Sequence, residues 1–216
     1  MQPAFWQESW DHEGYKTSFH RPDLHPYVAH YLPPERLAGR RVFVPLAGKT
    51  VDLAYFRDHA AHATGVELVE KPIHQFFHEQ GLPYADDGEG RFQSSRLTFL
   101  NRDLFALDRD EVGPIDFVLD RASLIAFPLE MRLKYLRKMD ELLPVGAQTL
   151  LITLEYEPYL DSPPFSVCPG NVAAYYGDNY EIELVESPLR PGHGMQRVFN
   201  LDFVREHGFL ITKVRE

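Results

Sequence analysis

Residues 41–67 constrain the fold of this chain more than any other segment. They predict a buried parallel strand, a tight turn at Gly48, a helix that begins at Thr50 and a second strand that ends in Glu67. The first strand is predicted from a short apolar run, Val42, Phe43, Val44 and Leu46. On the helix, Val51, Ala54 and Tyr55 recur at three-to-four-residue spacing, which predicts that they share one face. A strand, a glycine turn, a helix and a second strand form the front half of a nucleotide-binding unit.

The acidic residue at the end of this segment indicates what kind of nucleotide could bind. Glu67 lies about 20 residues beyond Gly48, the spacing at which Rossmann-like folds hold ribose hydroxyls. The turn PLAGK lacks the successive glycines that bring backbone N–H groups against a pyrophosphate, which argues against a dinucleotide. A phosphate-free adenosine ligand fits better, and S-adenosylmethionine is the commonest. The alternative is a structural turn in which Glu67 is a solvated strand end.

The rest of the chain continues the alternation of strands and helices. Helices are expected over residues 25–31, 72–80, 129–143 and 171–176, and strands over 97–100, 115–119, 149–154, 181–185, 196–203 and 209–214, with a polar loop at 85–90. This order predicts an α/β, Rossmann-like fold: a doubly wound, mostly parallel sheet with an antiparallel C-terminal edge. We expect one domain, residues 1–216. Ligands of such sheets bind outside the carboxyl ends of the strands.

Composition excludes several classes of partner. Acidic residues outnumber basic ones by 32 to 22, so the net charge of −10 disfavours a nucleic-acid partner. No apolar stretch approaches the roughly 20 residues that a bilayer span needs, and we expect no membrane association and a cytoplasmic location. Cys168 is the only cysteine, which agrees with a reducing compartment. The histidines lack zinc-ligand spacing, so no metal is predicted. We expect a monomer that acts on a small molecule.

Several motifs in order along the chain resemble one known family. They are FW, W and FH at Phe5, Trp6, Trp10, Phe19 and His20, the RVFVPLAGK turn, GVE with a following helix that contains FF and EQ, DRASLIAF at 120–127, and a Tyr-acidic-Pro stretch at 156–158 that leads to PPF at 163–165. Together they resemble the thiopurine S-methyltransferase family, including its bacterial members. The resemblance covers nearly the whole chain.

The resemblance implies an enzyme that transfers a methyl group from S-adenosylmethionine, leaving S-adenosylhomocysteine. It implies that Trp6 and Phe19 belong to an amino-terminal arm, within residues 1–36, that folds over the cofactor as a lid. Carried over by position, the other residues implied to bind the cofactor are Leu46 beside it, Glu67 at the ribose, Asp103 and Leu104 at the adenine, and Arg121 near the methyl donor and acceptor, where it is also the implied catalytic residue. Two further cofactor residues are expected from their own chemistry: Gly48 lets the backbone turn closely under the ligand, and Trp10 offers an aromatic face to the sulfonium.

Each of these roles has a structural alternative. Aromatic faces attract a sulfonium cation, but Trp6 and Trp10 have the i, i+4 spacing of an ordinary packed pair. Asp103 could accept a hydrogen bond from the adenine amine, or it could serve only a turn. Arg121 could stabilise an anionic acceptor such as a thiolate, or it could form a local pair with Asp120.

Three departures from the family pattern limit what is carried over. Ala47 stands where family members commonly have cysteine, the arm between Trp10 and Phe19 is longer, and the carboxyl-terminal register is uncertain. The expected acceptor is a small, soft nucleophile, a thiol by the habit of the family. Alternatives are a halide or oxygen-acid acceptor, a nucleotide-binding protein without catalysis, and an oxidoreductase, which the missing glycines disfavour.

Overall fold

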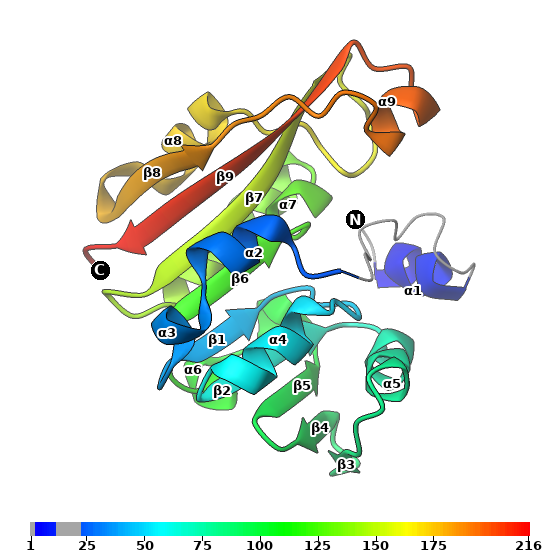
Figure 1. Cartoon of the computed structure of the whole chain (residues 1–216), viewed down its shortest axis with the longest axis vertical. Coiled ribbons are helices and arrows are strands. Elements are labelled where there is room, and N and C mark those ends of the chain that lie inside the picture. Colours follow the sequence, from blue (N-terminus) through cyan, green and yellow to red (C-terminus); the bar gives the residue numbers. More distant parts are fainter. Residues whose placement is uncertain (1–2, 12–22) are drawn as a thin grey trace. The chain divides into compact units, whose positions relative to one another are not determined.

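The computed structural model describes residues 3–11 and 23–216, and the chain divides into two compact units, Met1–Leu119 and Asp120–Glu216. Figure 1 colours the elements along the chain. The first unit contains α1 (Pro3–Asp11), α2 (Pro26–Tyr31), α3 (Pro34–Leu37), β1 (Arg41–Val44), α4 (Asp52–His59), β2 (His62–Glu67), α5 (Glu70–Glu79), β3 (Ala85–Asp86), β4 (Arg91–Ser94), β5 (Leu97–Asn101), η1 (Leu104–Ala106), α6 (Arg109–Val112) and the start of β6 (Phe117–Arg121).

The strands of the first unit follow the order β3-β4-β5-β2-β1-β6. β1 is parallel to β2 and to β6, and β2 is parallel to β5. β4 pairs with β5 antiparallel, and so does β3 with β4. Because parallel strands end at the same edge, the residues that follow β1, β2 and β5 gather there, as expected for a Rossmann-like sheet.

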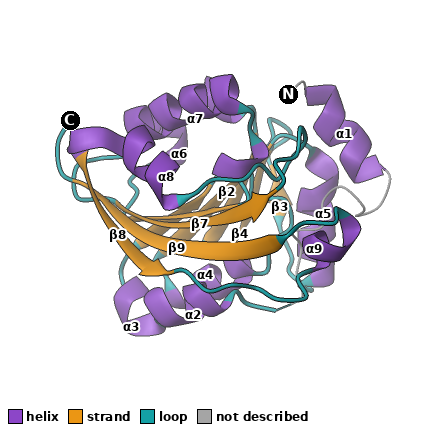
Figure 2. Ribbon diagram, turned by 90° about the horizontal axis from the view of Figure 1, so that it is seen from above, coloured by secondary structure: helices purple, strands orange, loops and turns teal. Residues whose placement is uncertain are grey.

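Helix α4 packs on β2 through a different face from the one predicted. Leu53 and Phe56 are fully buried, whereas Val51, Ala54 and Tyr55 are only half-buried. The reason lies in the neighbouring strand: a Cβ at Gly65 would stand 2.8 Å from Leu53 Cδ1. The absence of a side chain at Gly65 lets Leu53 approach β2 and sets the rotation of the helix. Figure 2 shows α4 on the same side as α2 and α3.

Helix α5 begins two residues before Pro72, and its predicted apolar face is confirmed. Ile73, Phe76 and Phe77 are buried, and the rings of Phe76 and Phe77 lie 5.1 and 5.6 Å from that of Phe99 on β5. These edge-to-face contacts hold the helix against the strand. The position of α5 matters for the site, because its first turn directly follows the end of β2.

The second unit contains an antiparallel group of strands with helices. Its elements are the end of β6, η2 (Leu124–Ala126), α7 (Leu129–Leu142), β7 (Gln148–Glu157), α8 (Pro169–Tyr176), η3 (Gly177–Asn179), β8 (Tyr180–Glu186), α9 (Gly194–Val198) and β9 (Phe203–Lys213). β9 is antiparallel to both β7 and β8. Figure 2 shows α7 and α8 on the same face of these strands. Parallel strands followed by this antiparallel edge agree with the predicted fold class.

Several sequence-based boundaries were wrong. The predicted strand at 196–203 is largely helix α9 and a turn, because Val198 and Phe199 are 62% and 40% exposed and have no sheet to cover them. The predicted loop at 85–90 contains β3 and precedes an unpredicted β4; in the turn that joins them, Asp87 Oδ1 accepts from Glu89 N and Arg91 N. α3 was also missed.

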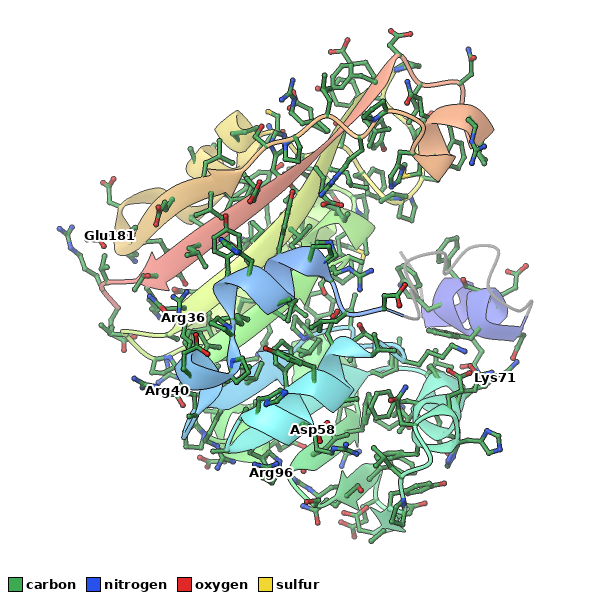
Figure 3. All side chains as sticks on the ribbon, viewed as in Figure 1. Arg36, Arg40, Asp58, Lys71, Arg96 and Glu181 are labelled. Carbon is green, nitrogen blue, oxygen red and sulfur yellow. The ribbon has the colours of Figure 1, made fainter. Side chains whose placement is uncertain are left out.

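β8 is an outer strand, and it carries acidic side chains on its exposed positions. Glu181 and Glu183 are exposed, and Figure 3 labels Glu181 at the outside of the second unit. Charged residues on an outer strand discourage pairing with another chain. In residues 3–11 and 23–216, none of the helices combines the length and apolar character needed to cross a bilayer. The same residues contain no group of three or more His, Cys, Asp or Glu side chains arranged to hold a metal ion.

Candidate active site

The turn after β1 has an unusual backbone. Leu46 and Gly48 have φ values of +47° and +52°, in the left-handed region. Glycine adopts this region freely, but a leucine there is strained by an amount on the order of 1–3 kcal/mol, and such strain clusters at ligand-binding sites. Ala47 N donates to Val66 O over 2.8 Å and so ties the turn to β2. Leu46 therefore lies beyond the strand in which its apolar character placed it.

Glu67 holds this turn in place. Its Oε2 accepts from Gly48 N over 2.8 Å, and its Oε1 accepts from Val69 N over 2.9 Å. The side chain joins the turn after β1 to the residue that precedes α5. Glu67 is only 7% exposed, so the interpretation as a solvated strand end is wrong. The spacing from Gly48 to Glu67, which predicted a functional pair, reflects a direct hydrogen bond.

The charge of Glu67 is poorly compensated. Burial raises the pKa of Glu67 to about 7, although hydrogen bonds from the backbone N–H groups of Val69, Gly48 and Leu68 act in the opposite direction. Within the described part of the chain, no basic side chain contributes to the shift. A ligand that donates hydrogen bonds to the carboxylate would stabilise its charged form, and paired ribose hydroxyls are suitable donors.

Asn101 is a positioning residue that no sequence motif indicated. Its Nδ2 donates to Glu67 O over 3.0 Å and to Leu68 O over 2.9 Å. Arg102 N also donates to Glu67 O, over 3.2 Å. β5 thereby fixes the end of β2. This role of Asn101 follows from the pairing of β2 with β5, which places Asn101 opposite Glu67.

The two residues predicted at the adenine follow β5 directly. Asp103 is exposed, and its Oδ1 accepts from Phe105 N over 3.0 Å, which caps η1. The turn role proposed for Asp103 is confirmed. Leu104 is buried, with 4% of its surface exposed. The contact of either residue with adenine stays a prediction.

The amino-terminal helix α1 is attached to α5. Lys71 Nζ donates to Trp10 O over 2.9 Å, and Figure 3 shows Lys71 beside α1. Trp10 is 7% exposed, so it packs in the first unit. Trp6 is half-buried and meets Phe5 edge to face at 5.2 Å. Phe19 lies outside the described residues.

Arg121, the predicted catalytic residue, belongs to the second unit. It is half-buried and is the last residue of β6. The carboxylate of Asp120 bonds elsewhere: Oδ1 accepts from Leu124 N over 3.0 Å and Oδ2 from Tyr135 OH over 2.7 Å. Consecutive residues of a strand point to opposite faces, so a local pair with Asp120 does not explain Arg121.

Comparison with known proteins identifies the family. The model of the thiopurine S-methyltransferase family matches residues 1–210. A thiopurine S-methyltransferase of Shewanella woodyi is 38% identical over 196 residues, which cover 87% of each chain. The corresponding protein of Shewanella putrefaciens is 35% identical over 192 residues, 86% of each chain. The chain belongs to the thiopurine S-methyltransferase family.

Solved structures agree on the fold. A 1,6-didemethyltoxoflavin-N1-methyltransferase of Burkholderia thailandensis, with bound S-adenosylhomocysteine, has a TM-score of 0.67 at 17% identity and covers 99% of this chain and 87% of its own. The magnesium protoporphyrin IX methyltransferase of Synechocystis, with bound S-adenosylmethionine, has a TM-score of 0.64 at 13% identity. The match covers 99% of this chain and 97% of the Synechocystis chain. The expected family and Rossmann-like class I fold are confirmed. The chain is an S-adenosylmethionine-dependent methyltransferase.

The residues of the first unit fit an adenosine-containing methyl donor. A buried carboxylate, which has no basic partner among residues 3–11 and 23–216, is available for ribose hydroxyls, and the strained turn brings backbone close to the same strand edge. The structure links Gly48 and Glu67 by a hydrogen bond and sets Asp103 after the strand that pairs with β2. Trp10 is connected to α5 through Lys71.

The raised pKa of Glu67 predicts a pH dependence of stability. An acid whose pKa is higher in the folded state stabilises the fold at low pH, and this contribution is lost as pH rises from about 4.5 to about 7. Relative to Glu67→Gln, the ligand-free wild type should lose about 3 kcal/mol of unfolding free energy over that range. Urea unfolding at several pH values measures the difference. Glu181→Gln, at an exposed position of β8, should follow the wild type; parallel curves for wild type and Glu67→Gln would contradict the assignment.

Proposed function

We propose that this methyltransferase methylates a small thiol, preferably an aromatic or heterocyclic one, at a site organised around Glu67. The observation that carries the proposal is the buried Glu67 carboxylate, which is bonded to the N–H groups of Gly48 and Val69 and has no basic partner in the part of the chain that the structure describes. The family supports sulfur as the acceptor atom, since the relatives are named thiopurine S-methyltransferases.

In this proposal the first unit holds the methyl donor. Glu67 accepts hydrogen bonds from the ribose hydroxyls, and the turn at Leu46 and Gly48 lies against the donor. Oδ1 of Asp103 is already engaged in capping η1, so its second oxygen is the one assigned to the adenine amine. Leu104 supplies apolar contact to the ring. Trp6, Trp10 and Phe19 exclude water and offer aromatic faces to the sulfonium.

The donor supplies an activated methyl group on a cationic sulfur, so the residues need only bind, align and exclude water. The acceptor sulfur attacks as a thiolate: one carbon–sulfur bond forms as the sulfonium–methyl bond breaks, and the thiol proton passes to solvent. Arg121 is assigned to the acceptor, because a guanidinium lowers the pKa of a nearby thiol without taking up a proton.

Other properties of the protein are proposed from its amino-acid sequence. We retain a single functional domain over residues 1–216, a monomer and a cytoplasmic location as predictions. The proposed partner is a small-molecule methyl acceptor.

The ribose contact predicts a loss of affinity. Glu67→Ala should weaken the binding of S-adenosylhomocysteine about ten- to a hundredfold, because charge-assisted hydrogen bonds contribute about 1.5–3 kcal/mol. Isothermal titration calorimetry measures the dissociation constant, with Glu181→Ala, at an exposed position of β8, as the control. An unchanged constant in a folded Glu67→Ala protein would remove Glu67 from the site.

The arm predicts a response to ligand. If residues 1–36 include a segment that orders over the donor, then S-adenosylhomocysteine should change the fluorescence of Trp6 and Trp10 and slow proteolysis before residue 25. Lys71→Met removes the donor to Trp10 O and should weaken this protection more than it weakens ligand binding. Equal protection with and without ligand would show that the arm is a fixed part of the core.

The acceptor assignment predicts a chemical preference. Methyl transfer from labelled donor to matched thiols, alcohols, amines and halides should be fastest with low-pKa thiols, because soft sulfur needs no strong base. Arg121→Ala should lower turnover more than donor affinity, and Arg121→Lys should retain part of the turnover because it keeps the charge. Preference for a non-sulfur acceptor, with thiols inert at every pH, would reject the thiol and leave the methyltransferase activity intact.

A further inference from the structure

The second unit contains a cavity of about 250 Å³ between α7, the end of α8 and the start of β8. Leu133, Leu136 and Met139 of α7 form its aliphatic wall. None of the residues assigned above to the methyl donor or acceptor lines it. Its volume suits a ligand smaller than a typical drug-sized molecule.

A buried carboxylate lies in this cavity, and no basic side chain of the described residues is its partner. Asp120 lines it and is 2% exposed. Its hydrogen bonds come only from neutral groups, Tyr135 OH and the N–H groups of Leu124 and Ser123. Burial raises the pKa of Asp120 to about 6, and no basic side chain of residues 3–11 and 23–216 contributes to the shift. A charge buried without a counterion is costly, and a cationic ligand would offset that cost.

Tyrosine rings form another part of the lining. Tyr176 and Tyr180 both line the cavity, and their ring centroids lie 5.1 Å apart at 77°. Tyr175 also lines it, and the guanidinium of Arg132 already lies 5.7 Å from its ring centroid. Perpendicular aromatic faces beside a carboxylate are the arrangement by which proteins recognise substituted ammonium ions.

A second acidic residue, Asp140, binds Tyr180 of this lining and is itself paired with Lys213. Tyr180 OH donates to Asp140 Oδ1 over 2.6 Å, and the same oxygen lies 3.1 Å from Lys213 Nζ. Lys213 is 1% exposed and also donates to the carbonyl of Leu143. Asp140 is therefore compensated, and Asp120 is not. Arg137 lines the cavity too, but it is exposed and does not contribute to the pKa shift of Asp120.

We propose that this cavity is a binding site for a small organic cation of the substituted ammonium class. The cationic head lies between Asp120 and the faces of Tyr176 and Tyr180, and the alkyl part packs on the aliphatic wall of α7. This site is separate from the methyl-donor site built on Glu67 and does not depend on which acceptor the enzyme methylates.

Choline and its neutral carbon isostere, 3,3-dimethylbutan-1-ol, test the proposal because they differ in charge and hardly in shape. Titration of the full chain, saturated with S-adenosylhomocysteine, should show choline binding about tenfold or more tightly than the isostere. Equal affinities, or no saturable binding of choline, would overturn the proposal. Displacement of choline by S-adenosylhomocysteine would also overturn it, because the cation would then occupy the donor site.

Variants of the lining locate the site. Tyr176→Leu and Tyr180→Leu should each weaken choline binding about three- to thirtyfold, and Asp120→Asn should abolish the preference for choline over the isostere. Tyr159→Leu is the matched control, since Tyr159 is 72% exposed and does not line the cavity. Circular dichroism and thermal unfolding verify each fold. If Asp120→Asn fails to fold, Tyr176→Leu decides: wild-type affinity for choline in that variant would reject the site.

Discussion

The candidate active site depends on one carboxylate that binds two separate backbone segments. Glu67 accepts from Gly48 in the turn after β1 and from Val69 before α5. Without this bridge, the strained turn would lose a buried partner for its N–H, and the cost of an unmade buried hydrogen bond is about 1–3 kcal/mol. The same oxygens are the groups proposed to receive the ribose, so the residue that shapes the turn is also the one proposed to bind the ligand.

This arrangement depends in turn on close packing behind it. Gly65 on β2 leaves room for Leu53 of α4, and Asn101 on β5 holds the carbonyl of Glu67. A larger residue at Gly65 would meet Leu53, Phe99 and Ala47 within 3.2 Å. The turn is therefore supported from the strand on which Glu67 lies, and the proposed methyl-donor site consists mainly of backbone groups and one charged side chain.

Two neighbouring charged residues of β6 have different surroundings. Asp120 and Arg121 are consecutive, and strand geometry directs their side chains to opposite faces. Asp120 bonds to Leu124 N and Tyr135 OH and lines the cavity beside α7, whereas Arg121 is the residue assigned to the acceptor. Adjacent opposite charges in the sequence look like a simple ion pair. The structure instead gives Asp120 neutral partners, which is why it retains an uncompensated charge.

The sequence by itself determined the order of most strands and helices, the family and the Gly48–Glu67 pair, because periodicity and motif spacing are local properties of the chain. It could not determine the buried face of α4, the role of Asn101 or the helix α9, because these depend on which segments meet in space. Val198 and Phe199 have strand-like character but no sheet to cover them. The cavity beside Asp120 likewise exists only because α7, α8 and β8 meet, and tertiary packing alone decides which buried charges are compensated.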